Sequence, residues 1–355
     1  MFNFFNKRLN KTSFFNPFFG FNKKQLAMIF QKFLNPTKLT LLALAFTFVA
    51  CSDDDENTTP SEEPLNIVET AQASADLTSL VAALQAADGD LVNVLSGGEF
   101  TVLAPTNAAF DAFLTATGFA DLSEVPTDVL ANILLNHVVA GSVMSTDLTA
   151  AGAGYTQTNA TNADGDVLSL YFNTTSGVVF NGVSTVSTAD IEATNGVIHI
   201  VDQVIGLPTI ATFATADPTF ETLVAALTRP DLEVPFVTIL GSTGQGTPLT
   251  AFAPTNDAFG DLLTELGIDD LSQIDVNLLT AVLLTHVVGE ANVRAEDLTQ
   301  DMAVPTLVQE NLTVDLTNGP QLVDPNGRVA NIIANNVQAY NGVVHVIDKV
   351  VLPLL

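Results

Sequence analysis

The stretch Phe100-Thr-Val-Leu-Ala-Pro-Thr-Asn-Ala-Ala-Phe110 decides the organisation of this chain because it occurs twice. Its second copy is Leu249-Thr-Ala-Phe-Ala-Pro-Thr-Asn-Asp-Ala-Phe259. Two further blocks repeat in the same order, one around a histidine and one near the end of each copy. Matched blocks in the same order indicate two copies of one domain, each long enough to fold around its own core. The further pairs are 133–139 with 282–288, and 195–202 with 341–348.

The charge of the chain limits its partners. The 355 residues include 39 acidic and 11 basic ones, and the formal net charge is -28. The first 50 residues hold most of the basic residues and no acidic one. Such a surface repels phosphate backbones and anionic lipid, which excludes nucleic acid and requires any membrane attachment to be covalent or inserted. The basic residues after position 50 are Arg229, Arg294, Arg328 and Lys349.

The N-terminal end carries a targeting pattern. Leu39–Ala50 is an uncharged apolar run that follows Lys32 and Lys38, and it is too short to span a bilayer comfortably. Cys51, the only cysteine, comes directly after it. This pattern resembles a bacterial lipoprotein signal, which implies that residues 1–50 are a leader and signal peptide and that Cys51 carries the lipid. The alternative is a short membrane anchor followed by an incidental cysteine.

Residues 51–64 are acidic and rich in Pro and Ser, and they hold too few apolar side chains to pack a core. They therefore read as a solvated tether. The run Ser52–Glu56 also looks like the surface-export signal of Bacteroidota lipoproteins, although a solvated charge run explains it equally well. The predicted location is the outer membrane, with display at the cell surface or, alternatively, at the periplasmic face.

Each copy is predicted to begin with a helix. Asp76 is expected to cap a helix whose apolar stripe begins at Leu77, and Asp217 is expected to cap its counterpart, with Pro218 in the first helical position. In the second copy the Gly-, Pro- and Thr-rich segment 228–248 is expected to be a loop.

The repeated stretch itself predicts a strand, a proline, a helix cap and a helix without any spacer. The strand ends at Pro105, either Thr106 or Asn107 accepts from the free amides of the next helix, and Phe110 is buried by that helix. These residues therefore read as architecture. Their counterparts in the second copy are Pro254, Thr255, Asn256 and Phe259.

The last part of each copy combines a third helix with a hairpin. His137 and His286 follow the apolar stripe of the helix and should point inward. Asn195-Gly196 and Asn341-Gly342 are expected to form the two-residue turn of the hairpin, with positive φ. The strand that follows each turn is apolar on both faces and should be covered on both sides. His199 and His345 lie within these strands.

The three repeated blocks resemble those of the fasciclin-like domain family, and the resemblance covers about residues 65–353. It implies an α+β fold of two tandem domains, 65–207 and 208–355, each a wedge or sandwich of short strands packed with several helices. It also implies roles in cell adhesion and matrix association. Asn136 and Thr285 stand where many members carry a tyrosine before the histidine, so integrin-type recognition is not expected to carry over.

The chemistry of the repeated residues has two interpretations. His137, His199 and Asp202 form a conceivable metal set, as do His286, His345 and Asp348, since imidazole and carboxylate suit zinc. Buried neutral histidines that bond to backbone, with aspartates that accept from nearby amides, are the more economical account. The acidic turns 162–166 and 324–327 are compatible with calcium, but neither continues into an EF-hand pattern.

The predicted function is binding and not catalysis. The sequence lacks a nucleophile elbow, a phosphate loop, a zinc-protease motif and a dinucleotide fingerprint, and no metal or cofactor is predicted. The chain is expected to be a surface-anchored adhesion protein that mediates cell–cell, matrix or polysaccharide association. Its partner would be a matrix polysaccharide or a cell-surface protein. The alternative is a periplasmic accessory protein that binds a small ligand or a metal.

Overall fold

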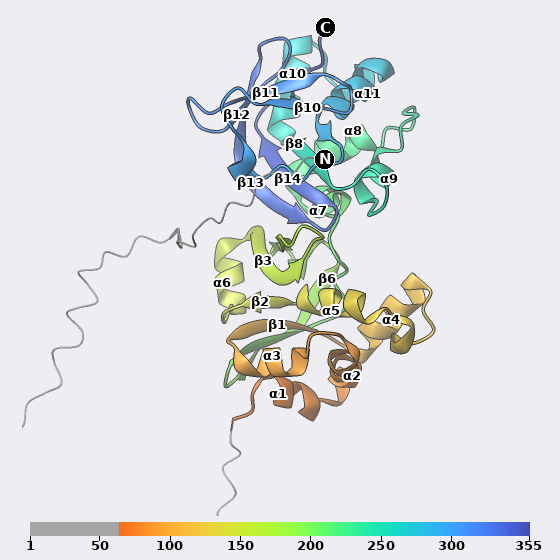
Figure 1. Cartoon of the computed structure of the whole chain (residues 1–355), viewed down its shortest axis with the longest axis vertical. Coiled ribbons are helices and arrows are strands. Elements are labelled where there is room, and N and C mark those ends of the chain that lie inside the picture. Colours follow the sequence, from red (N-terminus) through yellow and green to blue (C-terminus); the bar gives the residue numbers. More distant parts are fainter. Residues whose placement is uncertain (1–63) are drawn as a thin grey trace, which may run out of the picture. The chain divides into compact units, whose positions relative to one another are not determined.

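The computed structural model describes residues 64–355, which hold two domains built from the same succession of elements (Figure 1). The leader, Cys51 and the tether up to residue 63 lie outside the described residues. The signal peptide, the lipidation site and the tether therefore stay predictions.

The first domain has seven strands in one mixed sheet, in the order β2-β1-β7-β6-β5-β4-β3. The central strands β1 and β7 run parallel, and all other neighbours are antiparallel. The helices are α1 (Ile67–Ala73), α2 (Thr78–Ala86), α3 (Leu91–Gly97), α4 (Asn107–Thr117), α5 (Thr127–Leu135) and α6 (Ser145–Ala151), with 3-10 turns η1 (Ala75–Leu77) and η2 (Leu122–Glu124). The strands are β1 (Phe100–Pro105), β2 (Val138–Ala140), β3 (Ala153–Thr161), β4 (Val167–Asn173), β5 (Val179–Phe180), β6 (Ser184–Ala193) and β7 (Gly196–Val201).

The second domain repeats this plan with a seven-stranded sheet in the order β10-β11-β12-β13-β14-β8-β9, in which β8 and β14 are the parallel pair. Its helices are α7 (Ile210–Ala216), α8 (Glu221–Leu227), α9 (Phe236–Gly241), α10 (Asn256–Leu266) and α11 (Val276–Thr285), with η3 (Pro218–Phe220), η4 (Leu271–Gln273) and η5 (Ala295–Asp297). Its strands are β8 (Leu249–Pro254), β9 (Val287–Val288), β10 (Ala303–Pro305), β11 (Asn311–Asp315), β12 (Gln321–Val323), β13 (Val329–Ala339) and β14 (Gly342–Ile347).

Each parallel pair is buried on both faces because two apolar clusters meet it. Side chains alternate across a strand, so neighbouring residues of β1 enter different clusters. Val102 packs with the helices, while Leu103 packs on the other face with Phe172. In β7, Ile198 and Val201 divide in the same way. The predictions of two α+β domains and of a last strand covered on both sides are confirmed.

Two predictions about helices are wrong. Segment 228–248 is not all loop, because it contains the short helix α9, whose Phe236 and Leu240 are buried. So short a helix offers no sustained periodicity. Asp76 caps nothing and lies inside η1, which Ser74 precedes. In the second copy Asp217 does accept from the amide of Thr219, at 3.0 Å.

The hairpins form, but their turns lie one residue earlier than predicted. Ala193 pairs with Gly196, so the loop residues are Thr194 and Asn195, and Gly196 already belongs to β7. The reason is close packing. A Cβ on Gly196, where φ is +142°, would lie 1.9 Å from the carbonyl oxygen of Phe100 on the parallel neighbour. The same shift occurs at Gly342, next to Leu249.

Candidate functional site

The threonine and asparagine of the repeated stretch have different structural tasks. Thr106 caps its own helix α4, since its hydroxyl oxygen accepts from the amide of Ala109 at 3.2 Å. Asn107 serves a different helix: its Oδ1 accepts from Ser79 at the start of α2 (2.8 Å), and its Nδ2 donates to Ala75 (2.9 Å). The side chain of Asn107 therefore ties two helices together.

The second copy uses the same arrangement. Thr255 caps α10, and Asn256 accepts from Thr222 in α8 while it donates to Pro218. Each Pro-Thr-Asn corner thus fixes the direction of one helix and the position of the preceding one. Its polar atoms bond within the domain.

The asparagine before each hairpin glycine is a central structural residue that sequence reasoning took only as a turn residue. Oδ1 of Asn341 accepts from Ile210 (2.9 Å), and Nδ2 donates to Leu240 and Ser242 (2.8 Å each). Asn195 makes the equivalent bonds to Ile67, Leu95 and Gly98. One amide side chain thereby joins the last hairpin to two helices. Its exact repetition was the only sequence signal for this role.

The histidines that follow the third helix are buried and bonded at both ring nitrogens. Nδ1 of His137 donates to the carbonyl of Ile133 (2.8 Å), which leaves Nε2 to accept from the amide of Ile205 (2.8 Å). His286 does the same with Val282 (2.7 Å) and Val351 (3.2 Å). Burial lowers the pKa of each of these two imidazoles to about 4. Both rings are therefore neutral at pH 7.

The strand histidines differ between the copies. Nε2 of His199 donates to Val143 (2.9 Å) and Nδ1 accepts from the amide of Asp190 (3.1 Å). Nε2 of His345 donates to Val293 (2.8 Å), but its buried Nδ1 has no hydrogen-bond partner among the described residues. The ring of His345 stacks on Phe252, with centroids 5.7 Å apart, and burial lowers its pKa. Both rings serve the interior of the sheet.

The conceivable metal sets are not assembled. Three of the four histidines have both ring nitrogens engaged, so they have no lone pair left for a metal. Asp202 accepts from the amide of Thr185 (2.7 Å), and Asp348 accepts from Asn331 (2.8 Å). Within residues 64–355 no group of three or more histidine, cysteine, aspartate or glutamate side chains is placed to hold a metal ion.

The residues before the helix-end histidines are also interior. Asn136 is fully buried and donates to the carbonyl of Gly206 at 3.0 Å, and the hydroxyl of buried Thr285 donates to Ala281 at 2.8 Å. In the folded domains this pair of positions offers nothing to a partner.

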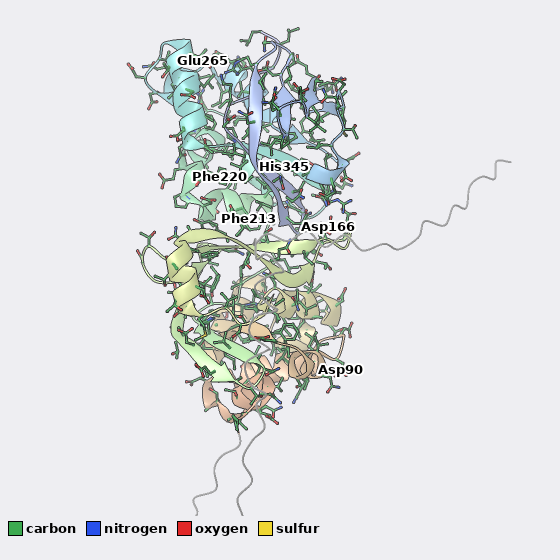
Figure 2. All side chains as sticks on the ribbon, turned by 90° about the vertical axis from the view of Figure 1, so that its left-hand side faces the viewer. Asp90, Asp166, Phe213, Phe220, Glu265 and His345 are labelled. Atoms are coloured by element: carbon green, nitrogen blue, oxygen red, sulfur yellow. The ribbon has the colours of Figure 1, made fainter. Side chains whose placement is uncertain are left out.

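The acidic turns have internal partners. Oδ1 of Asp324 accepts from the amides of Asn326 and Arg328, and its Oδ2 accepts from Leu352. Asp166 bonds across to the second domain, where Arg294 Nη1 lies 3.0 Å from one carboxylate oxygen and Asn292 donates to the other at 2.9 Å. Figure 2 labels Asp166 where the two domains meet.

The contact between the domains also has an aromatic part. Tyr155 and Tyr171 of the β3–β4 hairpin lie with ring centroids 5.1 Å apart, and Tyr155 meets Phe213 of α7 edge-on at 5.5 Å. Tyr171 belongs to the buried cluster of the second domain. The backbone amide of Gln338 donates to the hydroxyl of Ser169 at 2.9 Å. The hairpin of the first domain is thus part of the core of the second.

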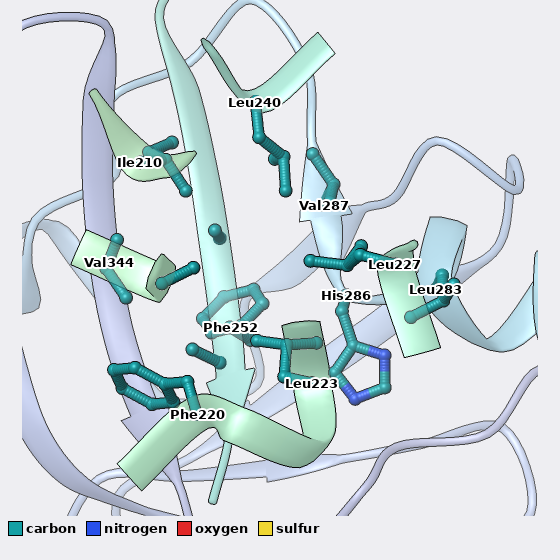
Figure 3. A pocket seen from close by; sticks show the side chains of 13 residues that line it. Ile210, Phe220, Leu223, Leu227, Leu240, Phe252, Leu283, His286, Val287 and Val344 are labelled. Atoms are coloured by element: carbon teal, nitrogen blue, oxygen red, sulfur yellow. The ribbon is translucent and has the colours of Figure 1, made fainter. Parts of the chain in front are cut away.

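One enclosed cavity lies inside the second domain, between α8, β8 and α11 (Figure 3). It holds about 30 Å³, and its walls are apolar except for the ring of His286. A cavity of this size accepts about one water molecule, and an apolar one stays dry. It is too small for an organic ligand.

Two open grooves are larger. One, of about 550 Å³, lies beside α9 and the loop that precedes β8. The other, of about 530 Å³, lies beside α3 and α5 of the first domain and is closed on one side by Leu207 and Tyr340. Both have the volume of typical small-ligand sites.

No helix among residues 64–355 is long and apolar enough to cross a membrane.

Comparison with known proteins gives the family. A model described as Fasciclin domain matches residues 75–208 and again residues 218–353. The transforming growth factor-beta-induced protein ig-h3 of Oryctolagus cuniculus is 32% identical over 268 residues, which are 72% of this chain and 35% of that protein. Protein sll1483 of Synechocystis is 35% identical over 177 residues, or 48% of this chain and 92% of that protein.

Further similarities extend to a bacterial surface protein and to a solved structure. The cell surface glycolipoprotein MPB83 of Mycobacterium bovis is 34% identical over 139 residues, or 37% of this chain and 54% of that protein. A FAS1 domain pair of the insect cell adhesion molecule Fasciclin I has 19% identity and a TM-score of 0.47, over 77% of this chain and 95% of that one.

The extent of these matches differs. The chain spans about a third of the length of the ig-h3 protein, but nearly all of protein sll1483. Neither the matched family nor the ig-h3 relative indicates an enzyme family. Together, the two matched segments cover most of the chain. The chain therefore belongs to the fasciclin-domain family and carries two tandem copies of the domain.

Proposed function

We propose that this protein is a surface-anchored adhesion protein that binds a matrix polysaccharide or a cell-surface protein and catalyses no reaction. The observation that carries the proposal is the internal use of the repeated polar residues. Thr106, Asn107, Asn195 and His137 all bond within the first domain, as their counterparts do in the second. The repeated residues build the domain, which leaves binding to the variable surface.

The relatives support a location outside the cell. MPB83 is described as a cell surface glycolipoprotein, and it is similar to this chain over one domain length. In this chain, Cys51 after an apolar run provides the residue for a lipid anchor. Two linked domains also increase avidity if each of them binds weakly.

The test of adhesion uses the mature chain displayed on cells and on beads. Cells that display the protein should bind to immobilised matrix polysaccharides or to partner cells, and soluble mature chain should compete. Turnover of any substrate that is lost in His137→Gln or His286→Gln, with the fold retained, would contradict a non-catalytic role.

Anchoring and display have their own test. Metabolic labelling with a palmitate analogue should mark the wild type and leave Cys51→Ala unlabelled. Protease added to whole cells should remove a surface-displayed protein and spare one that faces the periplasm. If the protein is labelled but protected from protease, the proposal of a lipid anchor stands and the proposed surface location is contradicted.

A further inference from the structure

We infer that the groove beside α3 and α5 is a docking site for a segment of a partner protein that carries lysine or arginine next to apolar side chains. This inference rests on the proposed binding function and specifies its partner. The groove is lined by both domains and holds about 530 Å³. Five of its lining residues are Leu91 and Val94 of α3, Val129 of α5, Leu207 of the connecting segment, and Tyr340 of the β13–β14 loop.

The walls of the groove expose apolar surface. Val94 and Val129 are 42% and 39% exposed, although both sit on helices that bury other faces. Tyr340 is half-buried and adds an aromatic ring to the lining. Apolar side chains gathered in one concave place mark a contact surface more strongly than apolar side chains scattered singly.

The rim of the groove is acidic and has no counter-charge. Asp88 and Asp128 lie side by side in the chain fold, since the amide of Asp88 donates to the carbonyl of Thr127. Both side chains are exposed, and neither has an ion pair or a hydrogen bond within residues 64–355. Asp128 also stands in the first turn of α5, where a negative charge favours the helix. In that role the exposed carboxylate of Asp128 can still pair with a cation from a partner.

No cation within residues 64–355 supplies the missing charge. The sequence contains no lysine or arginine from Cys51 to Thr228, so the first domain has none. The basic residues of the second domain already have acidic partners: Arg229 pairs with Asp231, Arg294 with Asp166, and both Arg328 and Lys349 with Glu265. A cation in the groove therefore comes from outside residues 64–355, and once the predicted leader is removed it comes from another molecule.

The combination of an apolar wall and a carboxylate rim selects the type of occupant. Lysine and arginine lay an aliphatic stem along apolar surface while the charged head reaches a carboxylate. Anionic glycans and anionic lipid are repelled by the same rim. A neutral glycan has no cation to pair with the two carboxylates. A basic segment with apolar neighbours satisfies both parts of the groove.

The groove is formed before any partner arrives. Asn132 of α5 holds the adjoining turn from both sides, since its Nδ2 donates to the carbonyl of Thr161 (2.8 Å) and its Oδ1 accepts from the Thr161 amide (3.0 Å). The backbone amide of Tyr340 donates to the carbonyl of Pro208 at 2.7 Å, which holds the β13–β14 loop to the connecting segment. A preformed site lowers the ordering cost of binding.

The test measures binding of a fluorescein-labelled peptide of alternating lysine and leucine to the mature chain, by anisotropy at 150 mM salt. The double variant Asp88→Asn/Asp128→Asn should raise the Kd about tenfold. The matched control is Asp76→Asn/Asp111→Asn, which removes two exposed carboxylates elsewhere in the first domain. It should leave the Kd within twofold. Tyr340→Ala should also weaken binding, with folding checked by circular dichroism.

Three results would overturn the inference. They are an equal loss in the control variant, no loss in the groove variant, or equal binding of a glutamate–leucine peptide. The adhesion assay of the proposed function separates the two claims. If cells that display the groove variant still adhere to the same surface as the wild type, the groove is not the site, and the adhesion proposal stands.

Discussion

The phenolic oxygen of Tyr155 donates a hydrogen bond to the carboxylate of Asp217, at 2.9 Å, and joins the first domain to the segment that opens the second. Asp217 also caps η3. The same carboxylate thus begins a helical turn and receives the neighbouring domain. Burial, followed by the nearby charge of Asp217, raises the pKa of Tyr155, so the phenol keeps its proton and remains a donor.

Tyr155→Phe should destabilise the joined domains by about 1 kcal/mol, because the buried carboxylate of Asp217 loses a donor. Urea unfolding followed by tyrosine emission measures this directly, since the chain has three tyrosines and no tryptophan. Tyr340→Phe is the control, because the hydroxyl of Tyr340 has no hydrogen bond within residues 64–355. Equal unfolding midpoints for the two variants would show that the bond to Asp217 contributes nothing.

Asn341→Ala should cost about 3 kcal/mol, because it leaves the Ile210 amide and two carbonyl groups without their partner in a buried place. The matched control is Asn277→Ala on the exposed face of α11, which should change the free energy of unfolding by less than about 0.5 kcal/mol. Denaturant titration of both variants measures the difference. A cost for Asn341→Ala as small as that of the control would refute the role assigned to this side chain.

Gly342→Ala should prevent the parallel pairing of β14 with β8. Its Cβ would lie 1.9 Å from the carbonyl oxygen of Leu249, and φ is +148°. We expect a loss of at least about 3 kcal/mol, visible as a large fall in the thermal midpoint. Gly260→Ala in α10 is the opposite case, since its Cβ meets no atom within 4 Å and its backbone is helical. That variant should keep or raise the midpoint.

Acid should destabilise both domains through His137 and His286. Each pKa is lowered in the folded state to about 4 from a reference value of 6.5, so below pH 6.5 the unfolded chain takes up protons that the folded chain refuses. Above pH 6.5 these histidines therefore do not lower the free energy of unfolding. As the pH drops toward 4, the free energy of unfolding falls by roughly 2 to 3 kcal/mol for each histidine. Asp324 and Arg328 face His286 and oppose each other's effect on its pKa.

Free energies of unfolding at pH 7 and pH 4.5 check this expectation. His286→Gln should be less stable at pH 7 but should lose less on acidification than the wild type. If His286→Gln loses as much unfolding free energy between pH 7 and pH 4.5 as the wild type does, other groups cause the acid sensitivity.

Features that depend on residues close together in the chain could be predicted from the sequence. The corner at Pro105 and Thr106 is local, so a strand end and a helix cap could be placed from the pattern alone. The inward direction of His137 followed from helical spacing. The different roles of Thr106 and Asn107 could not be predicted, because the hydrogen-bond partners of Asn107 lie on another helix.

Features that join distant segments escaped sequence reasoning. Asn195 bonds to residues near the start of its domain, and its hairpin is shifted by one residue because Gly196 must pass close to β1. The groove is built from α3, α5, the connecting segment and Tyr340, which no local pattern relates. Helix α9 is too short for a periodic signal.

The parallel pairing of β1 with β7 and of β8 with β14 also affects how the chain is made. In each domain an early strand lies directly beside the last one, so neither sheet can close until the final strand has been synthesised. Folding must wait for this long-range closure, which is slower than the formation of local contacts. The first domain can close while the second is still emerging. Its β3–β4 hairpin, which carries Tyr155, is then available for the contact that Tyr155 makes with Phe213 of the second domain.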